Sequence, residues 1–199
     1  MNISKVRTAS VKCQTTETDV TVKLNLDGTG KYQINTGIGF FNHMLELFAK
    51  HSLIDLTIVT KGDLNVDEHH TVEDTGIVLG MALAKALGNK RGIERYGFMV
   101  PMDETLAEVA LDLGGRSYMV WNVQFARAQI GDMPTELFEH FFKSLADNLK
   151  ANIHINLLYG QNSHHQAEAI FKAFARALRS AVRVDQRTRL VLPSTKGRL

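Results

Sequence analysis

The sequence has a single cysteine, only three prolines, and no long apolar run. Cys13 cannot form an internal disulfide, so a disulfide-stapled scaffold is excluded and the thiol is interpreted as a semi-buried strand residue rather than a nucleophile. No apolar stretch approaches the ~20 residues that a membrane-spanning helix needs. The N-terminus shows no charged-then-apolar leader. We therefore expect a cytoplasmic protein that does not enter a membrane.

A large excess of charge of one sign is also missing, because the formal net charge is only +2. Basic residues are nevertheless frequent near the C-terminus, and such a cluster can attract nucleic acid or a smaller anion. No aromatic stacking platform is interleaved with them, which argues against nucleic acid. The cluster thus favours a phosphate-bearing metabolite or a solvated helix face. Its members are Arg176, Arg179, Arg183, Arg187, Arg189, Lys196 and Arg198.

The amino-acid composition is that of an ordinary globular protein. Hydrophobic residues make up 44% and charged residues 22% of 199 residues, which is enough for a sizeable core in one domain or two small halves.

A short histidine motif occurs twice and organises the chain. His69-His70 is followed by Glu73, and the same spacing returns in His164-His165 and Glu168. Helical residues three or four apart share a face, so each glutamate can share a metal ion with one histidine while the adjacent histidine points about a quarter-turn away. Each motif can therefore serve two ions.

The donor types indicate which ions these would be. Imidazole mixed with carboxylate suits a borderline divalent metal such as Mn, Fe, Co, Ni or Zn, and the absence of thiolates argues against a structural zinc site. A lone His-His pair on a helix is usually polar surface. The recurrence of the pair with the same glutamate offset makes that interpretation much weaker.

The motif belongs to an internal repeat of about 95 residues. Aligning the halves places His43 against His140, so six histidines and two glutamates form two equivalent sets, one in each half. No Pro/Ser-rich linker separates the halves, and residues 89–96 are the expected junction. We expect half-repeats at 1–92 and 93–199, the second including a C-terminal phosphate-binding tail.

Residue patterns predict the same order of elements in each half. The predicted class is α+β, with each half a small sheet that carries its helices on one face, and the halves packing helix layer to helix layer or sheet to sheet. Strands are expected at 3–15, 19–26, 31–35, 53–60, 105–113, 117–125 and 152–158, and helices at 39–50, from the first motif to 87, at 135–150, and from the second motif onward.

Two sets of three histidines and one glutamate suit two octahedral ions that keep open positions. Open positions indicate catalysis or substrate binding rather than a structural role. The helix starts of one subunit need not meet, and completion across a symmetric interface would make oligomerisation part of the active site.

Taken together, the motifs resemble those of the imidazoleglycerol-phosphate dehydratase family over essentially the whole chain. Without a fused phosphatase domain, the sequence looks like the monofunctional form. The segments that carry the resemblance are Thr15-Thr16-Glu17-Thr18-Asp19, Gly37-Ile38-Gly39-Phe40-Phe41-Asn42-His43-Met44, the two His-His-x-x-Glu motifs, Asp112-Leu113-Gly114-Gly115-Arg116 and Pro193-Ser194-Thr195-Lys196-Gly197.

The resemblance implies tandem ferredoxin-like (split βαβ) halves, two Mn²⁺ ions per active site, and a homo-oligomer of 24 subunits with active sites between chains. It implies neither a nucleic-acid nor a membrane partner. The implied metal ligands are His43, His69, His70, Glu73, His140, His164, His165 and Glu168. The implied substrate contacts are Glu17, His43, Arg95, Arg116, Lys172, Ser194 and Lys196, and the residues expected to take part in catalysis are Glu17, His69, His70, His164 and His165.

The implied reaction converts D-erythro-imidazole glycerol phosphate to imidazole acetol phosphate in histidine biosynthesis. The proton lost from C2 is not next to a carbonyl and is weakly acidic. Binding the imidazole as imidazolate between two metals would let it expel the C3 hydroxyl, giving a diazafulvene-like intermediate with a more acidic C2 proton. Glu17 is the hypothesised base.

Two rival functions remain open at this stage. A dinuclear metallohydrolase of a phosphate ester would be expected to use Asp-rich motifs and a bridging carboxylate, which are not evident. A metal-storage or metal-assembled protein would use the histidines to hold subunits together.

Overall fold

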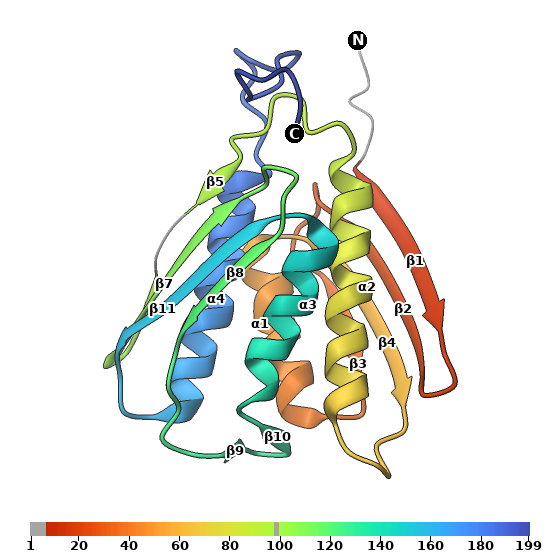
Figure 1. Ribbon diagram of the computed structural model, residues 1–199, viewed down its shortest axis with the longest axis vertical. Coiled ribbons are helices and arrows are strands. Elements are labelled where there is room, and N and C mark those ends of the chain that lie inside the picture. The colour runs from red at the N-terminus through yellow and green to blue at the C-terminus, as the bar shows by residue number, and fades with distance from the viewer. Residues whose placement is uncertain (1–6, 98–99) are drawn as a thin grey trace.

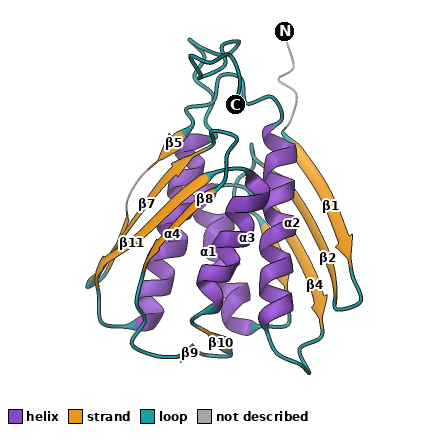
Figure 2. Ribbon diagram, viewed as in Figure 1, coloured by secondary structure: helices purple, strands orange, loops and turns teal. Residues whose placement is uncertain are grey.

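The computed structural model describes residues 7–97 and 100–199, in which four helices lie between two large β-sheets and a third, two-stranded sheet lies apart (Figure 1). Each half contributes one sheet and two helices, and the helix layers of the halves face each other (Figure 2). The α+β class is confirmed, and of the two predicted packings the chain adopts helix layer to helix layer. The helices are α1 (Gly39–Ser52), α2 (His69–Leu87), α3 (Leu137–Leu149) and α4 (Ser163–Ala181).

The first sheet has the order β1-β2-β4-β3. Its strands are β1 (Thr8–Gln14), β2 (Thr18–Asn25), β3 (Tyr32–Asn35) and β4 (Asp55–Gly62). The expected antiparallel opening is correct for β1 and β2 but wrong for β3, which lies at the far edge and pairs in parallel with β4. The chain reaches β4 only after crossing through α1, and this connection makes the pairing parallel. Residues 3–6 of the first expected strand lie outside the described residues.

The second sheet repeats this plan with the order β5-β7-β11-β8, and β6 also pairs with β7. β8 and β11 are parallel, as β3 and β4 are. Its strands are β5 (Tyr96–Gly97), β6 (Val100–Met102), β7 (Thr105–Asp112), β8 (Tyr118–Asn122) and β11 (Asn152–Tyr159), and β9 (Gln129–Ile130) forms a separate hairpin with β10 (Met133–Pro134).

The strand directions place the starts of all four helices at one end of the molecule, the lower end in Figure 1. Because β4 and β11 run toward this end, each delivers the chain directly to the start of the helix that carries a histidine motif. The turns β1–β2 and β6–β7 lie at the same end. The lower end therefore collects residues from both halves.

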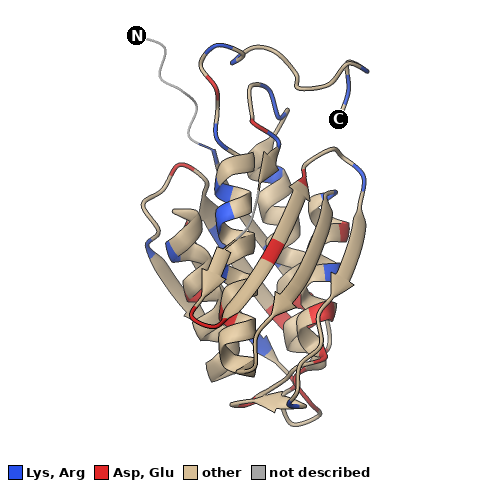
Figure 3. Ribbon diagram, turned by 90° about the vertical axis from the view of Figure 1, so that its left-hand side faces the viewer, with Lys and Arg blue, Asp and Glu red and all other residues tan. Residues whose placement is uncertain are grey.

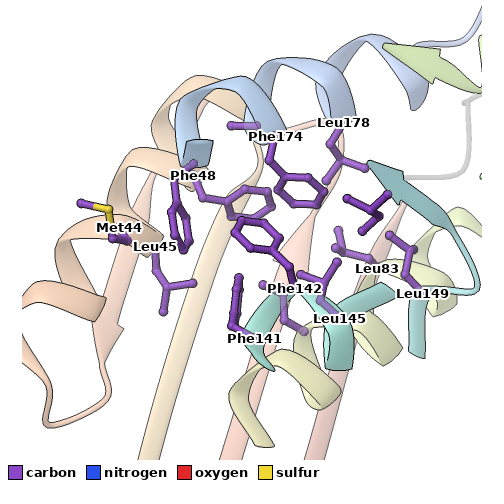
Figure 4. Close-up of a cluster of buried hydrophobic side chains, with 14 of the residues drawn as sticks. Met44, Leu45, Phe48, Leu83, Phe141, Phe142, Leu145, Leu149, Phe174 and Leu178 are labelled. Carbon is purple, nitrogen blue, oxygen red and sulfur yellow. The ribbon is translucent and has the colours of Figure 1, made fainter. Parts of the chain in front are cut away.

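Close helix contact and aromatic packing hold the two layers together. An added Cβ at Gly76 would lie 2.7 Å from the carbonyl oxygen of Phe141, and one at Gly80 would lie 2.7 Å from that of Leu145, so α2 and α3 approach through glycines. On the other side Phe48 of α1 stacks on Phe174 of α4 with ring centroids 5.6 Å apart. Figure 4 shows these apolar side chains meeting between the layers. Such interdigitation fixes the four helix starts relative to one another.

The segment after α4 (residues 183–199, the C-terminal tail) lies at the opposite, upper end, where Figure 3 marks several Lys and Arg residues. It packs on the chain that joins the halves: Glu94 N–H donates to the Arg183 carbonyl, and Gly92 N–H to the Val191 carbonyl. Within residues 7–97 and 100–199, no helix is long and apolar enough to span a membrane.

Candidate active site

One cluster at the lower end joins α1 to α4 (the α4 cluster: His43, His164 and Glu168). Glu168 Oε1 lies 2.9 Å from His43 Nε2 and 3.1 Å from His164 Nε2. Three ligand atoms of these residues lie within 4.8 Å of one another, the one such set of three among the described residues. The α4 cluster thus offers two imidazole nitrogens and a carboxylate oxygen to one point.

Lys172, one helical turn after Glu168, completes the surroundings of this carboxylate. Its Nζ donates to Glu168 Oε2 at 2.5 Å and contacts Met102 Sδ at 3.0 Å. Both side chains are largely buried, with exposed fractions of 15% for Lys172 and 11% for Glu168. Burial raises the pKa of the Glu168 carboxyl, but Lys172 and the two histidines outweigh it and lower this pKa to about 2. Glu168 is therefore held as an oriented carboxylate.

The second cluster joins α3 to α2 (the α2 cluster: His69, Glu73 and His140). His69 Nε2 lies 3.5 Å from Glu73 Oε2, and the rings of His69 and His140 have centroids 4.8 Å apart. The side chain of Glu73 is 41% exposed. Ile77 occupies the position that corresponds to Lys172, so the second cluster has no matching lysine.

The two clusters exchange residues between the halves. His43 of the first half meets the motif of the second half, and His140 of the second half stands beside the motif of the first. The sequence left open how the ligands divide between the two clusters, and the structure shows an exchange between the halves. Because the helix layers pack face to face, α1 lies against α4 and α3 against α2, and each cluster therefore draws on both halves.

The second histidine of each motif contacts a carboxylate outside its motif, Asp63 for His70 and Glu104 for His165. The ring planes of His69 and His70 differ by 80°, and those of His164 and His165 by 90°. His70 Nδ1 lies 3.1 Å from Asp63 Oδ2, and this hydrogen bond raises the pKa of His70. Within this chain each cluster therefore contains two histidines rather than three.

His165 is held by a carboxylate that the sequence argument left unassigned. Its Nδ1 lies 2.8 Å from Glu104 Oε2, which raises the pKa of His165 and lowers that of Glu104 to about 2, with help from the Asn162 N–H. Glu104 stands in the β6–β7 turn, as Glu17 stands in the β1–β2 turn. Both precede a threonine that begins the next strand. The repeat itself was thus a signal that could have found Glu104.

The helix starts are capped by side chains placed just before each motif. Asn162 Oδ1 accepts from His164 N–H at 2.9 Å and from His165 N–H at 3.4 Å, as expected for a cap residue. Asp67 Oδ1 accepts from His69 N–H at 2.8 Å. Two backbone donors of α4 and one of α2 are satisfied in this way, which fixes the direction from which the histidines leave the backbone.

Some residues with an expected role at the substrate lie far from both clusters. Arg95 donates to the Asp112 carboxylate and, over 3.0 Å, to the Pro193 carbonyl. Ser194 Oγ donates to the Arg198 carbonyl. Both residues lie at the upper end with Lys196 and with Arg116, whose segment joins β7 to β8. Glu17, by contrast, lies at the lower end, where its Oε2 is 3.8 Å from His70 Nε2.

A duplicated α+β fold with a histidine–carboxylate cluster at each of two helix pairs defines the class of this protein. Residues 36–178 match the imidazoleglycerol-phosphate dehydratase family. The chain belongs to this family, whose members are carbon–oxygen lyases of histidine biosynthesis. The resemblance predicted from the motifs is confirmed.

Individual relatives agree with this assignment. The imidazoleglycerol-phosphate dehydratase of Roseobacter denitrificans is 56% identical over 98% of this chain and 100% of its own length. The histidine biosynthesis bifunctional protein HisB of Spirosoma linguale is 56% identical over 96% of this chain but only 50% of its own length. This chain thus spans about half the length of the bifunctional relatives.

Solved structures show the same fold. The crystal structure of imidazoleglycerol-phosphate dehydratase from Staphylococcus aureus has a TM-score of 0.81 and 40% identity, and covers 89% of this chain and 99% of that one. The enzyme from Pyrococcus furiosus in complex with (S)-C348 has a TM-score of 0.82 and 36% identity, over 95% and 100% of the two chains.

Proposed function

We propose that this chain dehydrates D-erythro-imidazole glycerol phosphate to imidazole acetol phosphate, at metal-containing sites formed between copies of the chain. Membership of the dehydratase family supports the reaction. The observation that carries the metal proposal is the convergence of His43, His164 and Glu168 on one point.

The donor chemistry fits a borderline divalent ion. Two imidazole nitrogens face one oxygen of Glu168, while its other oxygen is fixed by Lys172, an arrangement in which a second charge orients the ligand. We propose Mn²⁺ as the ion. Its positive charge would lower the pKa of the substrate imidazole and so help the chain's own groups to remove the C3 hydroxyl and the C2 proton.

The second histidines support completion of each site by another copy. His70 and His165 turn away from the clusters of their own chain, and each is oriented by a carboxylate on Nδ1. Among the described residues Nε2 makes no hydrogen bond, with a carboxylate oxygen 3.8 Å away on Glu17 for His70 and on Asp103 for His165. This nitrogen can therefore serve as a metal ligand while the other nitrogen is held by a second group. We propose that each of these histidines completes a cluster of a neighbouring copy.

The phosphate group of the substrate needs positively charged side chains from outside the clusters. The basic residues with that expected role, Arg95, Arg116 and Lys196, lie at the end of the molecule opposite the clusters. We propose that another copy brings them to a cluster, together with Ser194, in a homo-oligomer with composite sites, for which the family resemblance suggests 24 subunits. Lys172 stands beside Glu168 and would add its positive charge to the same site.

Glu17 is the proposed base for the carbon-bound proton. It lies at the lower end, in the turn between β1 and β2, and approaches His70 without the close hydrogen bond that engages Glu104 with His165. Changing Glu17 to Gln should lower turnover by about 10²–10⁴-fold, the usual contribution of a general base, with metal content unchanged. Full turnover in this variant would remove the assignment.

One assay separates the three candidate functions. The Mn-loaded protein is incubated with imidazole glycerol phosphate, and imidazole acetol phosphate and inorganic phosphate are both measured. We expect the dehydrated product alone. Release of phosphate without that product would favour a metallohydrolase, and the absence of both would favour a storage or assembly role. The Glu168→Gln variant serves as the matched control for background reaction.

A further inference from the structure

The start of α1 is capped by a carboxylate from the other half of the chain. Gly39 N–H donates to Asp132 Oδ2 at 2.5 Å and Phe40 N–H to Asp132 Oδ1 at 2.9 Å. Ile38, at the N-cap position, makes no side-chain cap and the first turn contains no acidic residue. Asp132, in the turn between β9 and β10, thus supplies an acceptor that α1 lacks in its own sequence.

The geometry around the cap leaves little freedom. A Cβ on Gly39 would lie 3.2 Å from Asp132 Oδ2, and one on Gly131 would lie 3.3 Å from Phe40 Cβ. Gly131 also has a φ of +60°, a conformation that glycine adopts without strain. The two glycines therefore let the hairpin carrying Asp132 approach the helix start closely.

Phe40, the second residue held by this cap, touches both histidines of the α4 cluster. Its ring centroid lies 5.2 Å from that of His164 and 6.2 Å from that of His43, with interplanar angles of 72° and 61°. It also packs edge-on against Phe138 at 6.2 Å. The ring stands against imidazoles from two different helices, so a shift at the start of α1 must move or release both.

The α2 cluster has no comparable device among the described residues. Leu137 stands three residues before His140, where Phe40 stands before His43. Glu136, the N-cap residue of α3, makes no side-chain cap. The rings of His69 and His140 instead contact each other directly. Loss of the Asp132 cap should therefore disturb the α4 cluster and leave the α2 cluster unchanged.

We propose that Asp132 and Phe40 are positioning residues for the α4 cluster, in which the carboxylate from the β9–β10 turn fixes the start of α1 and Phe40 fixes the rings of His43 and His164. The metal-binding consequence rests on the proposed function, but the orientation of the rings does not. The inference can therefore be tested on metal-free protein as well as with metal.

The first measurement uses long-range ¹H–¹⁵N NMR of the histidine rings in full-length, metal-free protein. Asp132→Ala should shift and broaden the ring signals of His43 and His164 and leave those of His69 and His140 in place. Asp132→Asn should give an intermediate change, because its single amide oxygen can accept from only one of the two backbone N–H groups that the carboxylate holds. Phe40→Leu, which installs the residue found at position 137, should resemble Asp132→Ala.

The second measurement titrates Mn²⁺ into the metal-free protein by calorimetry. Wild type is expected to show two sites per chain. Asp132→Ala and Phe40→Leu should weaken one of them by about 10–100-fold, the usual effect of losing a group that orients a ligand. Glu136→Ala, which removes a carboxylate at the start of α3, is the matched control and should leave both affinities unchanged.

The outcomes are distinct. The inference would be overturned if Asp132→Ala changed the ring signals of both clusters equally. It would also be overturned if the melting temperature fell while the ring signals stayed unchanged, since Asp132 would then have a structural role only. Equal loss of both Mn²⁺ affinities would do the same. Wild-type protein that binds no Mn²⁺ would refute the proposed metal site, whereas the ring signals would still decide the positioning role.

Discussion

The α4 and α2 clusters descend from the same sequence pattern but differ in their surroundings. In the α4 cluster the glutamate is 11% exposed and contacts two histidines and Lys172. In the α2 cluster the glutamate is 41% exposed and contacts one histidine and the Ser144 hydroxyl, each at 3.5 Å. A repeated motif therefore specifies similar ligands without specifying similar electrostatics, because the residues around it have diverged.

The difference suggests a division between a rigid and an adaptable site. The α4 cluster is organised before any ion binds, since Lys172 and Phe40 fix its carboxylate and its rings. The α2 cluster would gain its third contact only when an ion draws Glu73 and His140 together. Orientation before binding reduces the entropy lost on binding. If both clusters bind the proposed metal, the α4 cluster should bind it more tightly.

The largest effects are expected from removing the two glutamates. Glu168→Ala and Glu73→Ala should each lower turnover by at least about 1,000-fold, because loss of a metal removes several kcal/mol of charge stabilisation.

The effects of these two substitutions on folding should differ. Glu168→Ala leaves the largely buried Lys172 without its partner and should cost about 2 kcal/mol, whereas Glu73→Ala should cost less than about 1 kcal/mol. Urea unfolding of the metal-free variants measures this, and equal losses would show that the two environments are equivalent.

Removing the second histidine of either motif should affect assembly as well as catalysis. His70→Ala and His165→Ala each delete the ligand proposed to reach a neighbouring copy, so each variant should lose metal and shift toward smaller species. Metal analysis and native mass spectrometry on the same samples measure both effects. A full complement of metal with an unchanged native mass in either variant would refute completion between copies.

Replacing Lys172 with isoleucine, its counterpart in the first repeat, should make the α4 cluster more like the α2 cluster. We expect the tighter Mn²⁺ site to weaken by about 10–100-fold while the other site keeps its affinity. Calorimetry on the assembled protein measures both sites, and Ile77→Leu is the control for a conservative change at the matching position. An unchanged tighter site would mean that Lys172 does not orient Glu168.

The smallest effect concerns acid stability of the start of α1. Burial opposes ionisation of Asp132, but the backbone N–H groups of Phe40 and Gly39 outweigh it and lower the pKa of this carboxyl below its ordinary 3.8. Because the pKa of Asp132 is lower in the folded protein than in the unfolded chain, the stabilisation by its ionised form is complete above about pH 3.8. It is lost as the pH falls through the folded-state pKa.

Accordingly, wild-type protein should lose more stability than Asp132→Asn when the metal-free proteins are compared at a pH well above 3.8 and at a pH well below it. Chemical denaturation at the two pH values measures this difference. Identical pH dependence in the two proteins would show that the ionised form of Asp132 contributes nothing to the cap.

Much of the fold was readable because the local signals were strong. Gly88 follows the last residue of α2 and Asn162 caps α4, and both residue types mark helix ends in a sequence. The order of strands within each sheet was harder to predict from the sequence. Nothing local distinguishes a strand that continues an antiparallel sheet from one that crosses to its far edge, and β3 was accordingly misplaced.

At the site, the sequence identified the ligand types but not their neighbours. Glu104 and Asp63 lie in connecting segments, where a carboxylate carries no local mark of the histidine it will hold. Asp132 lies 92 residues from the backbone N–H of Phe40, the nearer of the two donors it caps, so no spacing rule could connect them. Placing these contacts requires the fold.

The sequence by itself determined the duplication, the family and the two His-His-x-x-Glu motifs, because each depends on residue identity and short helical spacing. Only the tertiary structure decided that His43 joins Glu168 and that His140 joins His69. The physical reason is the packing of the helix layers: α1 buries its apolar face against α4, and α3 buries its face against α2. This exchange between halves follows from side-chain fit across the core, which no spacing within either repeat encodes.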